Sequence, residues 1–224
     1  NGAVLTVGAT LSSSDTIDFV RVFGNVGTVS TPTDGSVTAN KIGTGAVTSA
    51  KIADGTIVNA DINASASISG SKLGTGAVLQ VKNAQTGAMD TSTTTIPHDD
   101  TIPQNTEGEE VMTLAITPTS STNKLLITVN ILGSTSGPAY MMVALFQDST
   151  AGALAAINTD VRAASYPATI TFSHYMEAGT TSETTFKVRA GPDTSGTLTI
   201  NGVGGARRFG GVAPSSITIT EIGG

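Results

Sequence analysis

The sequence predicts an all-β protein in which a short, repetitive, trimeric shaft precedes an antiparallel β-sandwich head of the jelly-roll type. Thr and Ser supply about a quarter of the 224 residues, and 26 residues are Gly. Strong helix formers are therefore scarce. Hydrophobic residues make up 38%, many of them Val and Ile in short runs, which is typical of strands and exceeds what a disordered chain carries. The third observation is an internal repeat.

The repeat occupies residues 34–82 and advances by ten residues, once by eleven. Its copies read DGSVTANKI, TGAVTSAKI, DGTIVNADI, SASISGSKL and TGAVLQVK. Each copy opens with a turn pair, usually ending in Gly, which suits a bend that needs a positive φ. Two aliphatic side chains follow, five residues apart in each complete copy. The aliphatic positions are Val37, Ile42, Val47, Ile52, Ile57, Ile62, Ile68, Leu73 and Val78.

Two aliphatic side chains in ten residues cannot form a core within one chain. Ordering ten residues costs on the order of 10 kcal/mol or more, whereas burying two aliphatics contributes about 3 to 6 kcal/mol. We therefore expect residues 34–82 to form the shaft of a homotrimer, with these aliphatics on its axis. A flexible Gly/Ser/Thr linker is the alternative, but a random linker would not keep Val and Ile in phase. A parallel β-helix does not match a step of ten residues.

Residues 1–33 are expected to form a β-hairpin, with strands at 3–11 and 16–24, and a connector into the shaft. The hairpin would be the last part of an upstream domain, or would dock on a neighbouring chain. Because the chain opens Asn-Gly with neither Met nor a leader, we expect more sequence upstream.

Residues 83–224 are expected to form the head, because strand-length runs alternate there with turn signals and show no helical period. The runs are 111–117, 124–132, 140–147, 154–158, 169–176, 184–190, 197–201 and 215–222. In the second run, Leu125, Ile127, Val129 and Ile131 share one face. Residues 140–146 are apolar on both faces, which predicts a central strand or one that packs against another subunit.

Composition excludes several functional classes. The net charge is −6 and only 12% of residues are charged, so no basic patch could follow a phosphate backbone, and nucleic-acid binding is excluded as a primary role. The absence of Cys excludes disulfides, thiolate zinc sites and cysteine nucleophiles. No apolar run approaches the roughly 18 residues of a membrane span. We expect no cofactor.

We also expect no enzymatic activity. A glycosidase needs two carboxylates about 5 to 9.5 Å apart, and most acidic residues here fall in polar loops, where solvated acids are common. The acids considered are Asp99, Asp100, Glu107, Glu109, Glu110, Asp160, Glu177 and Glu183. A nucleophilic triad would have to use one of two histidines, and the chain has no G-x-S-x-G elbow.

Neither histidine is expected to bind a metal. His174 shares a strand face with Ile170, Phe172 and Met176, which favours an interior or interfacial position over a ligand role. His98 precedes Asp99 and Asp100 in a loop, but this group lacks a closed ligand set.

Glycan recognition usually uses aromatic platforms and planar polar groups, and the chain has three Tyr, six Phe and no Trp. The candidates for receptor contact are Tyr166, Tyr175, Arg207, Arg208 and Phe209. Two adjacent arginines in a Gly-rich loop could make bidentate bonds to a carboxylate or phosphate of a cell envelope. A solvated or intersubunit salt-bridged pair is the other interpretation.

Several longer motifs carry a resemblance to a known family. The runs VLQVKNAQTG (78–87), TIPHDDTIPQNTEGEEVMTLAITPTSSTNKLLITV (95–129), ALFQDSTAGALAA (144–156), FKVRAGPDTSGTLTING (186–202) and GARRFGGVAPSSITITEI (205–222) resemble the C-terminal head of tail-fibre proteins from tailed bacteriophages. The repeats GSVTANKI and GAVTSAKI are similar to those that precede such heads. The resemblance spans about residues 34–224.

The resemblance implies a trimeric, β-structured, extracellular fibre of the virion that attaches to the host surface. Other virion tail proteins would bind through the missing N-terminal part. His98 departs from the family, which carries a bulky aromatic or aliphatic residue there, so no special role is expected for it.

We therefore expect attachment through three equivalent weak sites for a surface glycan or envelope polymer. The alternatives are a structural or decoration fibre with no receptor role, or a bacterial surface adhesin. A polysaccharide-degrading tailspike is disfavoured because no acid pair emerges.

Overall fold

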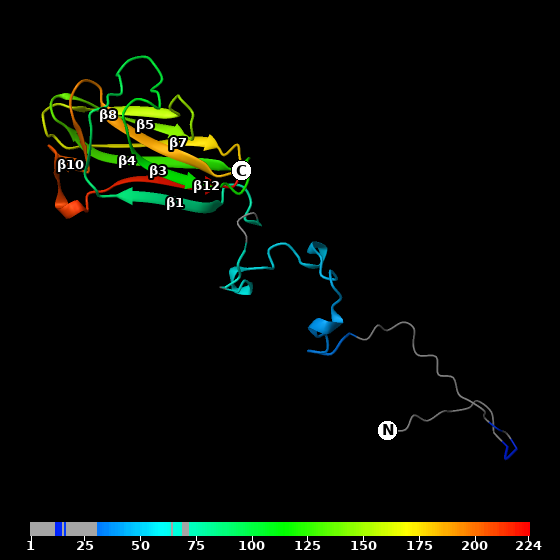
Figure 1. The fold of residues 1–224 in the computed structure, drawn as a ribbon. Helices are drawn as coiled ribbons and strands as arrows, with labels where there is room; N and C mark the ends of the chain where they lie inside the picture. Colours follow the sequence, from blue (N-terminus) through cyan, green and yellow to red (C-terminus); the bar gives the residue numbers. More distant parts are fainter. Residues whose placement is uncertain (1–11, 15, 17–30, 64, 69–71) are drawn as a thin grey trace. The chain divides into compact units, whose positions relative to one another are not determined.

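A computed structural model of the chain describes residues 12–14, 16, 31–63, 65–68 and 72–224. It contains two compact units, residues 1–66 and residues 67–224, which are described separately (Figure 1). The hairpin expected from strands 3–11 and 16–24 lies outside the described residues.

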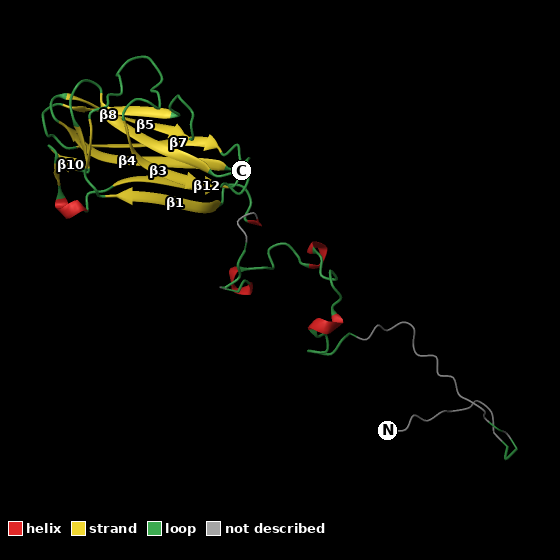
Figure 2. Ribbon diagram, in the orientation of Figure 1, coloured by secondary structure: helices red, strands yellow, loops and turns green. Residues whose placement is uncertain are grey.

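The second unit is built from two antiparallel sheets and a small hairpin (Figure 2). In the first sheet, β1 (Val78–Thr86) pairs with β12 (Ser215–Ile222), which pairs with β4 (Lys124–Thr135). The other edge of β4 pairs with β7 (Ala168–Glu177) and then with β9 (Leu198–Ile200), beyond which lies β2 (Asp90–Ser92). The second sheet has the order β3 (Glu109–Ile116), β8 (Thr184–Pro192), β5 (Ala139–Gln147), β6 (Ala155–Val161). The hairpin joins β10 (Gly202–Val203) to β11 (Ala206–Arg207).

The predicted all-β, antiparallel fold is confirmed, and each of the runs proposed in the head contains a strand. The alternation predicted for β4 is also present, because Leu125, Ile127, Val129 and Ile131 are all fully buried. Their partners in the main core come from both sheets, and a fully buried aliphatic or aromatic side chain contributes about 1.5 to 3 kcal/mol. They include Met141, Val143, Leu145, Phe186, Val188, Ile217 and Ile219.

Strand β5 is buried on both faces, as its sequence suggested. It lies centrally in the second sheet, between β8 and β6. Its outward residues Met142, Ala144 and Phe146 form a second apolar cluster with Ile96. A loop of the same chain therefore covers this face, and β5 does not need another subunit to be buried.

Strand β1 begins at Val78, within the range 34–82 that was predicted as shaft. Its pairing with β12 continues to Thr86, so the last repeat copy passes directly into the first sheet. The C-terminal end holds this entry in place. The Gly76 amide donates to the Gly223 carbonyl at 2.8 Å, and the Gly223 amide donates to the Ala77 carbonyl at 2.9 Å.

In the first unit, residues 31–63 combine tight turns with single turns of 3-10 helix: η1 (Ala39–Lys41), η2 (Ser49–Lys51) and η3 (Asn59–Asp61). The Ser36 amide donates to the Thr33 carbonyl at 3.0 Å across the first turn. The turn glycines Gly35, Gly45 and Gly55 have φ values of 72°, 74° and 77°, which confirms the predicted positive-φ bends. The described residues 31–63 contain no strand, because an extended segment needs a neighbour to pair with and each copy bonds locally.

The aliphatics of the repeat are uncovered in the single chain. The side chains of the nine predicted axial residues are 41% to 57% exposed. By contrast, the aliphatic side chains of the main core of the head are buried. The structure of one chain does not test whether other subunits cover them, and the trimeric shaft stays a prediction.

One buried carboxylate ties together the segments around the start of β1. Glu221 on β12 is fully buried. One of its oxygens accepts from the Thr119 amide at 2.7 Å, the Thr119 hydroxyl at 2.8 Å and Asn123 Nδ2 at 2.5 Å, and the other accepts from Gln80 Nε2 at 2.5 Å. Burial by itself raises the pKa of Glu221, but these hydrogen bonds outweigh it and hold the pKa below its ordinary value.

We predict that Glu221→Gln lowers the free energy of unfolding by about 1 to 3 kcal/mol at about pH 7, because an amide nitrogen would face donors in a buried site. A depressed carboxyl pKa stabilises the fold above the unfolded-state pKa, and this contribution is lost as pH falls through the folded-state pKa. The difference in unfolding free energy between wild type and Glu221→Gln should therefore be smaller at about pH 3, as measured by urea unfolding. Glu177→Gln, which removes an exposed carboxylate, is the control. A difference in unfolding free energy between wild type and Glu221→Gln that is equal at both pH values would contradict this explanation.

Candidate functional site

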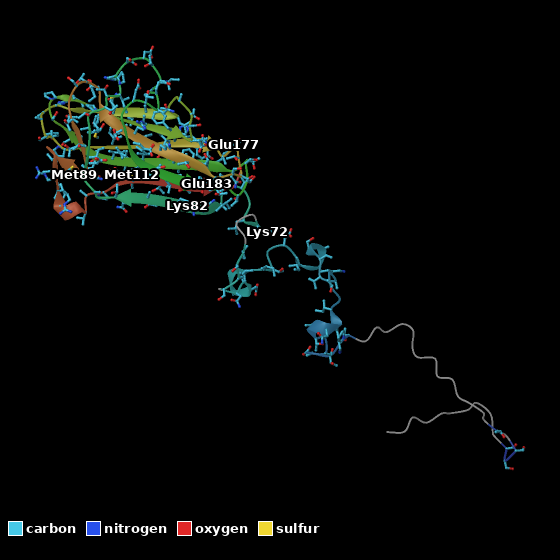
Figure 3. The ribbon with its side chains drawn as sticks, in the orientation of Figure 1. Lys72, Lys82, Met89, Met112, Glu177 and Glu183 are labelled. Carbon is cyan, nitrogen blue, oxygen red and sulfur yellow. The ribbon has the colours of Figure 1, made fainter. Side chains whose placement is uncertain are left out.

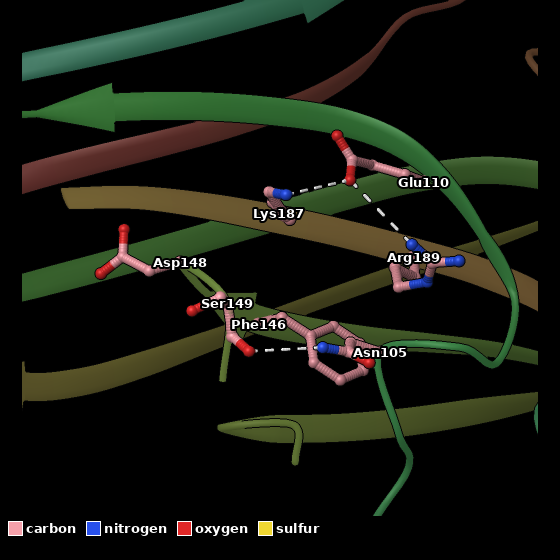
Figure 4. A pocket seen from close by; sticks show the side chains of 7 residues that line it. All are labelled: Asn105, Glu110, Phe146, Asp148, Ser149, Lys187 and Arg189. Carbon is pink, nitrogen blue, oxygen red and sulfur yellow. Dashed lines mark hydrogen bonds and ion pairs between the residues drawn. The ribbon is translucent and has the colours of Figure 1, made fainter. Parts of the chain in front are cut away.

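A polar pocket lies on the outward face of the second sheet, between β3, β5 and β8 and the loops beside them (Figure 4). Its volume is about 310 Å³. The lining side chains are Asn105, Glu110, Phe146, Asp148, Ser149, Lys187 and Arg189.

Strand register brings these side chains together. Lys187 and Arg189 alternate with the buried Phe186 and Val188 along β8, so both cations point outward. Glu110 on β3 lies directly opposite Arg189. On the other side of β8, Phe146 of β5 lies opposite Lys187 and is almost completely buried.

One carboxylate serves both cations. Lys187 Nζ lies 3.5 Å from Glu110 Oε2, and Arg189 Nη1 lies 4.0 Å from the same oxygen. Figure 4 shows both contacts converging on Glu110. The side chains of Lys187 and Glu110 are 36% and 37% exposed, so this group remains open to solvent.

Backbone carbonyls fix the orientation of Arg189. Its Nε donates to the Glu107 carbonyl at 2.8 Å and its Nη2 donates to the Gly108 carbonyl at 2.7 Å. Gly108 has a φ of 62°, and a Cβ there would lie 2.7 Å from Ile96 Cδ1. Glycine thus allows the loop to pass close over the second apolar cluster and present its carbonyls to Arg189.

The opposite side of the pocket is fixed by the turn after β5. Asp148 accepts from the Thr185 amide at 2.8 Å and from the Thr184 hydroxyl at 2.9 Å. Asn105 Nδ2 donates to the Ser149 and Thr150 carbonyls at 3.4 and 3.3 Å. The site is therefore a preformed recess that offers cations at one side and polar side chains at the other.

The candidates for receptor contact are all exposed, and none lines this pocket. Arg207 ends β11, Arg208 precedes η5 (Phe209–Gly211), and Phe209 is 78% exposed. Tyr166 lies near this hairpin, because a Cβ on Gly204 would lie 2.6 Å from the hydroxyl of neighbouring Ser165.

Tyr175 is distant from the other receptor candidates. It pairs with Leu126 near the far end of β7, while Ala168 at the near end pairs with Gly133. At about 3.3 Å per residue, the two ends of this strand segment are separated by about 23 Å. The structure thus places four of the five candidates near one end of the sandwich and Tyr175 elsewhere.

The histidines differ in environment. The His98 ring centroid lies 4.5 Å from that of Tyr140, and its Nε2 lies 3.2 Å from Asn158 Nδ2. His174 is half-buried on the inward face of β7, the face predicted for it. Among the residues that the structure describes, no three or more His, Asp or Glu side chains gather as metal ligands would.

Several of the acidic residues are engaged locally. Asp99 accepts from the amide and hydroxyl of Thr101, which, with a small contribution from His98, hold its pKa below the ordinary value. Glu177 pairs with Lys124 at 2.8 Å, and Asp160 pairs with Arg162 at 3.2 Å (Figure 3 labels Glu177).

Glu110 is among the acids considered from the sequence, but the sequence pattern alone does not predict the pocket around it. The alternation in Phe186-Lys187-Val188-Arg189 was a usable signal, because it puts two cations on one outward face. The approach of Glu110 to them depends on the pairing of β3 with β8, which one sequence does not specify.

Within the described part of the chain, no helix is long and apolar enough to cross a membrane.

No protein-family model and no curated protein matches the chain. Among solved structures, it is similar to one described as CBM4, with 15% identity over 41% of this chain and 56% of that chain and a TM-score of 0.30. It is similar to the C-terminal domain of EclA, described as a sugar-binding protein, with 16% identity, 52% and 75% coverage and a TM-score of 0.32. It is also similar to the enzymatically active domain of bacteriophage CBA120 tailspike protein 4, with 11% identity, 55% and 19% coverage and a TM-score of 0.23. The chain thus spans about half the length of the first of these structures.

Proposed function

We propose that this chain forms the shaft and head of a homotrimeric virion tail fibre, which attaches to the host surface by binding a glycan or envelope polymer. The observation that carries the proposal is the series of aliphatic residues kept in phase along the repeat and left 41% to 57% exposed. Selection against exposed apolar surface makes such a series unusual unless a partner covers it. Three copies around an axis provide that cover.

The head is compatible with the same proposal, because one chain closes its own core. Its main core and second apolar cluster are closed within one chain, so three heads can stand side by side as rigid units. A rigid trimer presents three equivalent sites, and simultaneous engagement on a repetitive surface raises avidity above single-site affinity.

We propose binding without catalysis. Asp99, Asp160 and Glu177 are engaged with Thr101, Arg162 and Lys124, and Glu110 faces two cations. Each of these carboxylates thus has a polar or charged partner within the chain, whereas glycoside hydrolysis needs two carboxylates that face each other across the scissile bond.

The direct test is competition for host cells. Purified protein should bind the host and reduce adsorption of the phage that carries this fibre. Normal adsorption at saturating protein would favour a structural fibre or a bacterial adhesin. Release of reducing sugar from envelope material would instead favour a degrading tailspike.

We predict that alanine at both Arg207 and Arg208 weakens cell binding and leaves thermal unfolding unchanged, because both side chains are exposed. The loss per site should be small, about threefold to tenfold, but avidity multiplies it across three subunits. Binding is measured by flow cytometry with labelled protein. Unaltered binding would remove this loop from the receptor site.

We predict that Ile52→Asp opens the shaft, because three carboxylates would meet at the axis at a cost of several kcal/mol. Thermal unfolding should then show a lower Tm than in wild type. Ala50→Asp is the matched control, since it adds the same charge to the same repeat copy at an exposed position outside the aliphatic series. Equal Tm values for wild type and Ile52→Asp would contradict an axial aliphatic column.

A further inference from the structure

We propose that the pocket between β3, β5 and β8 binds a saccharide unit that carries an acidic substituent, a carboxylate or a phosphate. The inference rests on the proposed attachment function and names the class of ligand for it. It adds a recognition site that is separate from the exposed aromatic and arginine residues near β11.

The charge at one side of the pocket is incompletely balanced. Lys187 and Arg189 share the single carboxylate of Glu110, which leaves one net positive charge at this side, and Asp148 balances that charge at the opposite side of the pocket. Both contacts, at 3.5 and 4.0 Å, exceed the roughly 2.7 to 2.9 Å of a direct charge-assisted hydrogen bond. The two cations can therefore donate hydrogen bonds to a second oxyanion, supplied by a ligand.

Arg189 is prepared for this role before a ligand arrives. Its Nε and Nη2 are occupied by the Glu107 and Gly108 carbonyls, so its side chain cannot swing away. Its Nη1 remains on the side of Glu110 and Lys187. Because the guanidinium is already ordered, little conformational entropy is lost when an anion binds.

The rest of the pocket suits the hydroxyl groups of a sugar. Asp148 accepts two hydrogen bonds from the start of β8, and a carboxylate has further lone pairs for a ligand hydroxyl. Ser149 and Asn105 add polar atoms beside it. The volume of about 310 Å³ is at the lower end for ligand pockets, which indicates one saccharide unit.

The competing explanation is a purely structural ion cluster that joins β3 to β8. The role of Glu110 distinguishes the two. In a structural cluster, Glu110 is simply the ion-pair partner of both cations, whereas in a binding site it competes with the ligand for them. Removing its charge should then strengthen ligand binding.

The experiment is calorimetric titration of the purified chain with glucuronate, glucose 6-phosphate and glucose. We expect the two acidic sugars to bind more tightly than glucose, and their relative affinity identifies carboxylate or phosphate as the preferred group. Lys187→Met should weaken acidic-sugar binding about fivefold or more, and Glu110→Gln should strengthen it. Lys82→Met is the matched control, because it removes an exposed cation from β1 in the other sheet (Figure 3) and should change nothing.

The inference is overturned if acidic sugars bind no better than glucose, or if Lys187→Met and Lys82→Met behave alike. It is also overturned if Glu110→Gln leaves affinity unchanged and only lowers thermal stability. Adsorption to host cells is measured in parallel with the same proteins. If wild type adsorbs to host cells and Lys187→Met adsorbs equally well, the pocket is not the receptor site but the proposed function stands. If wild type does not adsorb, the proposed function itself is overturned.

Discussion

The aliphatic side chains of the ten-residue repeat are exposed in the single chain, and the proposed assembly follows from this constraint. Each of the first three copies bends through a positive-φ glycine and a single turn of 3-10 helix, both closed by local hydrogen bonds. Local bonds of this kind fix the phase of the aliphatic side chains but bury none of them. In the homotrimer that we propose, equivalent copies around an axis would bury these side chains with the same geometry at every step.

The sandwich meets the opposite condition, because its two sheets close a core without help. The repeat meets the sandwich at β1, where the last repeat copy becomes a strand of the first sheet. Glu221 fixes this point through Gln80, Thr119 and Asn123, and the C-terminal Gly223 bonds the residues just before β1.

The sequence allowed much of the fold to be predicted, since the features that specify it are local. Alternation identified the buried face of β4, and turn pairs identified the glycines with positive φ. Other features depend on pairing between distant segments. The start of β1 at Val78, the burial of Glu221 and the meeting of Glu110 with Arg189 all follow from strand register. Tyr175 illustrates the same limit, because its exposure could be predicted but its distance from Tyr166 could not.

The most direct measurement is the native mass of the purified chain by light scattering on a sizing column. We expect a homotrimer, and three copies of the 22.4 kDa chain have a mass of about 67 kDa. A stable monomer of 22.4 kDa would contradict it, because the aliphatic series of the repeat would then remain exposed to water with nothing to cover it.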